Sequence, residues 1–189
     1  MARRPARARR REAVTALGLA IVALSVGPAA GEDRSLEYPV KAQYLYKLAP
    51  FVEWPPAAAT SAPPPVTLCV VGVDPFGPIL DEAVAGKRIA SRPIVVLRLE
   101  RVDRSAGCQV AYVAGSGAQS VADALQNLRG APVLTVTDEA RGAAPVGIVH
   151  FVVRDNRVRF LISPQAAARN GLRISSKLLS LAVGVGAAK

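Results

Sequence analysis

The sequence predicts a single-domain α/β protein: a mostly parallel sheet flanked by helices on both faces, with a C-terminal antiparallel hairpin and a terminal helix. Three observations lead to this class. Short apolar runs typical of fully buried strands alternate with segments of helical periodicity. Two later apolar runs enclose a short polar turn, which is typical of a hairpin. The 189 residues suffice for one domain, and a hydrophobic content of 51% excludes a disordered or fibrous chain.

The first expected element is an amphipathic helix that ends at Pro55 and Pro56. Its apolar side chains recur at helical spacing, and two lysines and a glutamine lie outside that stripe. The stripe consists of Val40, Tyr44, Leu48, Phe51 and Val52, and the polar positions are Lys41, Gln43 and Lys47. A loop rich in proline and alanine, residues 56–65, follows the helix.

The middle of the chain alternates expected strands and helices. Residues 66–73 form a continuous apolar run bounded by turn signals, which predicts a buried strand. Asp74 and Pro75 end this strand and precede a short helix that extends to Val84. The next elements, in order, are strands at 94–99 and 109–114, a helix over 121–128 and a strand at 133–136.

The C-terminal part combines a β-hairpin with two helices. Polar residues 154–157 separate two apolar strands and form a tight turn. Gly171 ends the first helix, and Ser175 or Ser176 caps the second one. We expect the hairpin to add antiparallel strands at one edge of the parallel sheet. In chain order, these elements are strands 148–153 and 158–162, helix 164–170 and helix 177–183.

The first 31 residues have the three-part pattern of a secretory signal peptide. Six arginines within the first eleven residues precede the apolar run 16–26, and small residues follow it. A transmembrane anchor is one alternative, but the run is shorter than the roughly 20 residues that a spanning helix needs. A basic nucleic-acid-binding arm is another, but an apolar run would not follow such an arm. We therefore expect export to the periplasm, cleavage near Gly31 and a mature domain over residues 35–187.

The expected signal peptide, residues 1–31, carries half of the net charge of +10. Without residues 1–31 the chain keeps 18 basic and 13 acidic residues, a net charge of +5. Only 5% of the residues are aromatic, so the composition does not indicate a surface for base stacking. We expect no nucleic-acid partner for the mature chain.

The mature chain contains two cysteines, Cys69 and Cys108. An even number of cysteines in an oxidising compartment favours a disulfide. Two buried free thiols are the alternative, because Cys69 lies within an apolar run. A metal site would need further ligands, and His150 is the only histidine.

No motif in the chain indicates catalysis or a cofactor. Residues 115–120 (GSGAQS) follow an expected strand, open a helix and precede Asp138 at a distance typical of dinucleotide sites. Ser120 replaces the third glycine of that fingerprint, however, and an exported protein meets little nicotinamide cofactor. His150 lies within an expected strand, and the chain has no nucleophile-elbow motif. We therefore expect a protein that is not an enzyme and that uses no cofactor or metal.

An alternative function of another class is a periplasmic small-ligand or anion-binding protein, or an enzyme, that uses helix N-termini. The two candidate positions follow the first and third expected strands. They are the loop 72–77, which contains Asp74 and Pro75, and the turn at Gly117. Both would lie at the carboxyl ends of strands, where α/β sheets usually bind ligands.

Several segments, in order, resemble the blocks of a known family. The most specific are the Phe-x-x-Trp-Pro end of the first helix and the C-terminal stretch Gly-Leu-x-Ile-Ser-Ser-x-Leu-Leu-x-Leu-Ala. The matching segments are 40–55 (VKAQYLYKLAPFVEWP), 68–77 (LCVVGVDPFG), 108–114 (CQVAYVA), 133–138 (VLTVTD), 147–162 and 166–182. Together they cover nearly all of the mature chain. On these segments the sequence resembles the YfiR family of exported regulatory proteins.

The resemblance implies a periplasmic, non-enzymatic α/β protein with no cofactor. The type member of the family restrains a membrane-bound diguanylate cyclase by binding its periplasmic region, and an outer-membrane lipoprotein captures it. The implied partner of this chain is therefore the periplasmic part of an inner-membrane diguanylate cyclase or sensor kinase, in cyclic di-GMP signalling and biofilm control. An outer-membrane lipoprotein and a second copy of the chain, in a homodimer, are further candidate partners.

The resemblance also implies that Cys69 and Cys108 form the disulfide of the family. Better-known members carry a second cysteine pair near the C-terminal region, which this chain lacks. For partner binding, the candidates are the aromatic side chains of Phe51 and Trp54 at the end of the first helix. Arg157 and Arg159 on the hairpin are candidates for steering an acidic partner.

Overall fold

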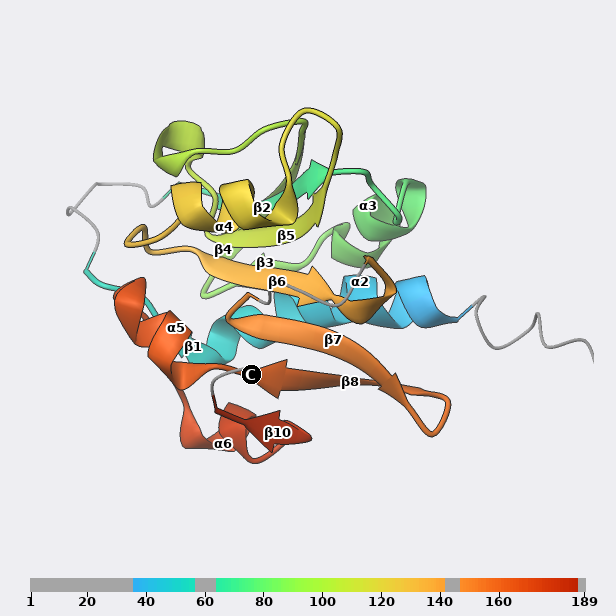
Figure 1. Cartoon of the computed structure of the whole chain (residues 1–189), viewed down its shortest axis with the longest axis vertical. Coiled ribbons are helices and arrows are strands. Elements are labelled where there is room, and N and C mark those ends of the chain that lie inside the picture. The colour runs from blue at the N-terminus through green and yellow to red at the C-terminus, as the bar shows by residue number, and fades with distance from the viewer. Residues whose placement is uncertain (1–35, 57–63, 142–146, 187–189) are drawn as a thin grey trace, which may run out of the picture.

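The computed structural model describes residues 36–56, 64–141 and 147–186 (Figure 1). The expected signal peptide, residues 1–31, lies outside the described residues. Among the described residues, no helix has both the length and the apolar character needed to cross a membrane.

The centre of the molecule is an eight-stranded sheet with the strand order β10-β8-β7-β6-β5-β2-β4-β3 (Figure 1). Five neighbouring strands, from β4 to β7, are parallel, and β8 pairs antiparallel with β7. The α/β class and the mostly parallel sheet with a C-terminal antiparallel hairpin are therefore as predicted. The strands are β2 (Val66–Gly72), β3 (Arg88–Ile89), β4 (Arg92–Leu99), β5 (Val110–Gly115), β6 (Leu134–Asp138), β7 (Val149–Arg154), β8 (Arg157–Ile162) and β10 (Gly184–Val185).

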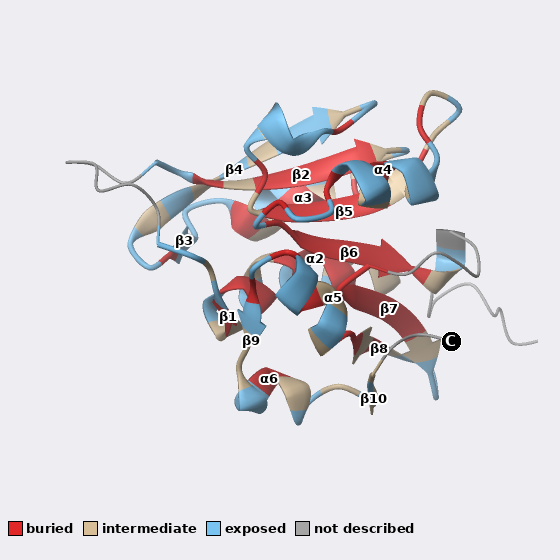
Figure 2. Cartoon of the chain, turned by 60° about the vertical axis from the view of Figure 1, so that its left-hand side comes forward, coloured by how far each residue is buried: buried red, intermediate tan, exposed pale blue. Residues whose placement is uncertain are grey.

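Helices cover both faces of this sheet. On one face, α2 (Glu37–Leu48) and α3 (Pro78–Val84) close the larger apolar core. On the other face, α4 (Val121–Asn127) closes a smaller core over β2 and β5. Because both faces are covered, the central strands are almost continuously buried (Figure 2). Two short helices, α5 (Pro164–Arg169) and α6 (Ser176–Leu179), follow the hairpin.

The buried face of the first helix differs from the predicted stripe. Lys41 has no exposed surface, whereas Val40 is 39% exposed. The buried positions are Lys41, Ala42, Leu45 and Leu48. The prediction was wrong because it assigned every lysine to solvent, and the ammonium group of Lys41 instead meets a buried carboxylate.

The first helix is also shorter at its C-terminal end than predicted. It ends at Leu48 and continues as a 3₁₀ turn over Ala49–Phe51. Pro50 has no N–H to donate to the preceding turn, which accounts for this end. The chain then forms β1 (Val52–Glu53), which pairs antiparallel with β9 (Arg173–Ile174) in a small second sheet.

The terminal helix was also predicted too long, because α6 ends at Leu179. The residues after it turn back to the hairpin, where β10 pairs parallel with β8. Val183 N donates to Phe160 O at 3.0 Å, and Gly186 N donates to Ile162 O at 3.0 Å. Pairing with the open edge of β8 therefore takes the place of the last helical turn.

Candidate partner-binding surfaces

The four residues predicted to bind a partner lie at the two ends of α2. Phe51 and Trp54 follow its C-terminal end, whereas Arg157 and Arg159 on β8 line a groove beside its N-terminal end. A helix of 12 residues is about 18 Å long. The structure therefore groups these residues into two separate surfaces rather than one.

The first surface, which we call the α2–hairpin groove, has a volume of about 850 Å³. It lies between the N-terminal half of α2 and the β7–β8 hairpin. Its apolar side chains include Leu36, which is 64% exposed, and Val40. Tyr44 forms part of the floor and packs against Phe151 and Phe160. The lining residues are Leu36, Glu37, Tyr38, Val40, Tyr44, Glu139, Ala140, Val153, Asn156, Arg157, Val158 and Arg159.

The two acidic side chains of the α2–hairpin groove are already paired. Glu37 accepts a short hydrogen bond from Lys41. Glu139 accepts hydrogen bonds from the backbone N–H of Val153 and from Arg154, whose guanidinium lies 3.0 Å away. Arg157 and Arg159 have no ion-pair partner among the described residues. The groove thus combines apolar walls with two uncompensated positive charges, which suits an acidic partner.

The second surface, around Phe51 and Trp54, serves the protein's own core. The indole N–H of Trp54 donates to Pro132 O at 3.0 Å, and its ring packs against the larger core. Phe51 is half-buried, and the ammonium group of Lys177 lies 5.7 Å from the centre of its ring. Each side chain therefore has an intramolecular role at this end of α2.

A buried ionic cluster fastens α2 to the sheet, and the sequence analysis missed it. Lys41 Nζ lies 2.6 Å from Asp138 Oδ2, and neither side chain has any exposed surface. The Tyr112 hydroxyl donates to the same carboxylate at 3.1 Å, and Ala140 N donates to its other oxygen at 3.0 Å. The only signal in the sequence was an aspartate at the carboxyl end of an apolar strand.

His150, the only histidine in the sequence, is a buried side chain of β7. Its Nδ1 lies 2.9 Å from Thr137 Oγ1, which also accepts from Gly147 N at 2.8 Å. Burial lowers the pKa of His150, and the nearby carboxylates of Asp138 and Glu139 oppose part of that shift. The hydroxyl beside this ring, Thr137 Oγ1, is itself buried and also accepts from Gly147 N, so the geometry indicates a structural hydrogen-bond network.

The loop after β2, one of the two alternative anion sites, is closed by its own contacts. Arg98 on β4 binds the carboxylates of Asp74 and Asp81, at 2.7 and 2.6 Å, and also donates to Gly77 O. These bonds lower the pKa of Asp81 and raise that of Arg98. Phe76 N donates to Asp74 Oδ1 at 2.7 Å. An incoming anion would therefore meet two carboxylates rather than free amides.

The turn over residues 115–120, the other alternative site, also uses its amides internally. Ser116 N donates to Gln119 O at 2.8 Å. Ala118 N and Gln119 N both donate to Ser116 Oγ. Ser120 caps α4 through Asp123 N. Three of the amides that would hold a phosphate, those of Ser116, Ala118 and Gln119, are thus used within the turn.

Comparison with family models decides the classification. A model described as YfiR/HmsC-like matches residues 38–183, which is most of the chain and all of the central sheet except β10. The chain belongs to the YfiR/HmsC-like family. Comparison with curated proteins gave no match.

The YfiR/HmsC-like family is periplasmic and regulatory rather than catalytic. Among the described residues, no group of three His, Cys, Asp or Glu side chains could hold a metal ion. Membership also implies interaction with a membrane signalling protein.

The predicted disulfide is present in this YfiR/HmsC-like chain. Cys69 and Cys108 are bonded, with their Cα atoms 5.8 Å apart. Cys69 lies within β2, and Cys108 lies just before the neighbouring strand β5. Both are buried in the smaller core beneath α4. The bond therefore joins the two central strands on the face opposite α2.

Proposed function

We propose that the mature protein is a periplasmic, non-enzymatic regulator that binds the periplasmic part of an inner-membrane signalling enzyme and holds it inactive. A diguanylate cyclase is the first candidate for that enzyme, and a sensor kinase is the second. Loss of the regulator would then raise cyclic di-GMP and promote biofilm formation. The observation that carries the proposal is the family match over residues 38–183.

The α2–hairpin groove is the surface that we assign to this partner. Its walls are apolar, and the charges of Arg157 and Arg159 are not compensated by described carboxylates. An acidic segment with apolar anchors would match both features. Phe51 and Trp54, at the other end of α2, form a second candidate surface for the same partner.

A genetic experiment with charge-reversal variants tests the proposal. Deletion of the gene should raise cyclic di-GMP, and the wild-type gene should restore the original level. Arg157→Glu with Arg159→Glu should fail to restore it, because like charges would face the acidic partner. Arg101→Glu is the matched control, since Arg101 is exposed and forms no ion pair among the described residues.

The outcomes separate the function from the surface. If deletion leaves cyclic di-GMP unchanged and no inner-membrane receptor is recovered by crosslinking, the cyclase-repressor proposal is refuted. If deletion raises cyclic di-GMP but the double variant restores the original level, the assignment of the partner to the α2–hairpin groove is wrong. Trp54→Ala with unchanged melting temperature and lost repression would move the assignment to the second surface.

A further inference from the structure

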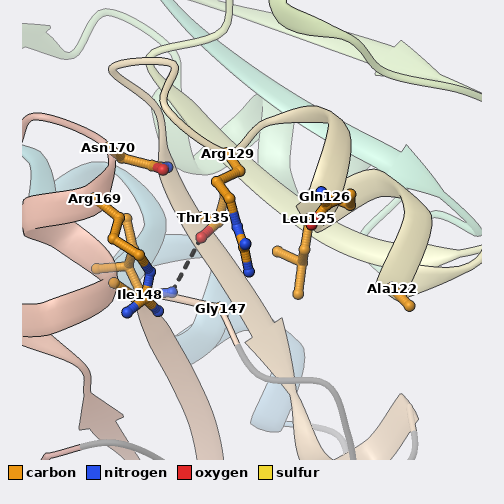
Figure 3. A pocket seen from close by; sticks show the side chains of 10 residues that line it. Ala122, Leu125, Gln126, Arg129, Thr135, Gly147, Ile148, Arg169 and Asn170 are labelled. Atoms are coloured by element: carbon orange, nitrogen blue, oxygen red, sulfur yellow. Dashed lines mark hydrogen bonds between the residues drawn. The ribbon is translucent and has the colours of Figure 1, made fainter.

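A second concave site lies between α4 and α5, apart from the α2–hairpin groove, and we call it the α4–α5 pocket. Its volume is about 280 Å³. The residues that line it come from α4, from α5, from the turns that follow these helices, from β6 and from the segment just before β7 (Figure 3). They are Ala122, Leu125, Gln126, Arg129, Thr135, Gly147, Ile148, Ala166, Arg169 and Asn170.

Two arginines face this pocket without a compensating charge. Figure 3 shows the guanidinium groups of Arg129 and Arg169 reaching over Thr135 and Gly147 from the two walls. The lining contains no acidic side chain, and neither arginine forms an ion pair with any described residue. Two like charges that share one concave site repel each other unless an anion lies between them.

The spacing of the two arginines is set by a buried side chain next to them. Asn170 follows Arg169 in the chain, and its amide donates to Val133 O at 3.0 Å. The oxygen of the same amide accepts from the backbone N–H of Gly130, the residue after Arg129, at 3.0 Å. Asn170 is only 7% exposed. This bridge ties the two walls together, so the backbone positions that carry the arginines are fixed before any ligand arrives.

The floor adds one more donor and an apolar region. Thr135 Oγ1 accepts from Ile148 N at 3.0 Å, which leaves its hydroxyl proton available to a ligand (Figure 3). Leu125, Ile148 and Ala166 supply apolar contacts. A volume of about 280 Å³ lies at the lower end of the range for ligand sites. The occupant must therefore be small.

We infer that the α4–α5 pocket binds a small oxyanion-bearing metabolite, with its carboxylate or phosphate group between Arg129 and Arg169. Guanidinium groups match the oxygen geometry of both head groups in bidentate fashion. The apolar floor would hold a short hydrocarbon body. This site is separate from the α2–hairpin groove and does not depend on the function proposed above.

Titrations of the mature protein with defined probes test the inference. Inorganic phosphate and butyrate represent the two head groups, butyramide is the uncharged analogue of butyrate, and chloride at equal ionic strength controls for screening. Saturable binding should shift the backbone amide resonances of Gly147 and Ile148. Arg129→Gln with Arg169→Gln should weaken it at least about tenfold. Lys47→Gln with Arg101→Gln is the matched control, because it removes two exposed positive charges outside both sites, and it should leave the binding unchanged.

Each outcome decides for or against the site. The site is supported if phosphate or butyrate binds saturably to the wild type and this binding is lost in the Arg129/Arg169 double variant. The probe that binds more tightly identifies the head group. The inference is refuted if neither probe saturates below about 10 mM, which corresponds to an affinity too weak for a specific site. It is also refuted if chloride or butyramide gives the same shifts, or if the double variant binds as the wild type does. The two arginines are exposed, and circular dichroism establishes that the variant is folded.

Discussion

At the scale of single residues, the most consequential contact is the ion pair of Lys41 and Asp138 inside the core. Removing two charges from water costs several kcal/mol, and the pair is tolerated only because each charge meets partners. Lys41 also contacts Glu37, and Asp138 also accepts from Tyr112 and from a backbone amide. The pair fixes the position of α2, and with it one wall of the α2–hairpin groove.

Lys41→Met should therefore lower the free energy of unfolding by roughly 3–5 kcal/mol, because it leaves the Asp138 carboxylate buried without its counter-charge. Urea denaturation followed by circular dichroism measures this change. Lys47→Met is the control on the same helix: Lys47 is exposed, and its replacement should change stability by less than about 0.5 kcal/mol. Equal effects of the two substitutions would show that the buried pair does not anchor the helix.

His150 gives the molecule a pH dependence with a defined sign. Its pKa is lowered in the folded protein, mainly by burial, so the unfolded chain binds the proton more readily. The contribution of His150 to the free energy of unfolding should thus be complete above the unfolded pKa of about 6.5. It should decline as the pH falls below that value.

His150→Gln should flatten the stability profile between about pH 6.5 and 5, because glutamine does not titrate. Thermal unfolding of both proteins across that range measures the difference. Parallel profiles for the wild type and the variant would mean that other groups cause the dependence. Glutamine can still accept the Thr137 hydrogen bond, so the comparison isolates the charge.

At the scale of elements, the closest backbone approach lies where β2 and β5 end side by side. Gly72 has a φ of +89°, and a Cβ atom there would lie 2.2 Å from the carbonyl oxygen of Gly115. Val73 N donates to the same oxygen at 2.9 Å. The crevice that often holds ligands in such sheets is thus filled by the chain itself.

Gly72→Ala should lower the free energy of unfolding by roughly 2–4 kcal/mol, through left-handed strain and backbone displacement. Gly117→Ala is the matched control in the neighbouring turn, where a Cβ atom would meet nothing within 4 Å. It should change stability by less than about 0.5 kcal/mol. Chemical denaturation of the three proteins tests this, and a similar cost at both positions would contradict it.

Most long elements could be predicted from local patterns, whereas the elements made by distant pairing could not. Apolar runs and a polar turn are enough to locate β2, β5, β7 and β8. The short strands β1, β9 and β10 have no such pattern, because their backbone bonds go to residues far away in the chain. The prediction that Lys41 faces solvent failed for the same reason: its partner Asp138 is 97 residues away.

The residues of the candidate sites also divide into those that local patterns could predict and those that only the folded chain brings together. Arg157 and Arg159 could be proposed because both lie on one predicted hairpin, although the groove beside them requires the position of α2. Arg129 and Arg169 could not be linked from the sequence, since Asn170 brings them together only in the folded chain. The pairing of Cys69 with Cys108 was predictable because the mature chain has no other cysteine.

At the scale of the whole molecule, cleavage of the signal peptide would change the net charge of the chain. The exported form should begin near Glu32 and carry a net charge of +5 rather than +10, because residues 1–31 contain six of the arginines. Mass spectrometry of the protein from periplasmic extract checks the new N-terminus. An intact Met1 or Ala2 in that fraction would refute cleavage.

The small sheet of β1 and β9 constrains when the domain can become complete. Val52 pairs with Ile174, and the carboxylate of Glu53 lies 2.8 Å from the guanidinium of Arg173, across 120 residues of sequence. A chain that emerges N-terminus first, from a ribosome or a translocase, cannot close this sheet until almost its last residues are free. The high contact order of this closure makes it a late and slow folding step. Until then the segment after α2 that bears Phe51 and Trp54 lacks the strand that pairs with it.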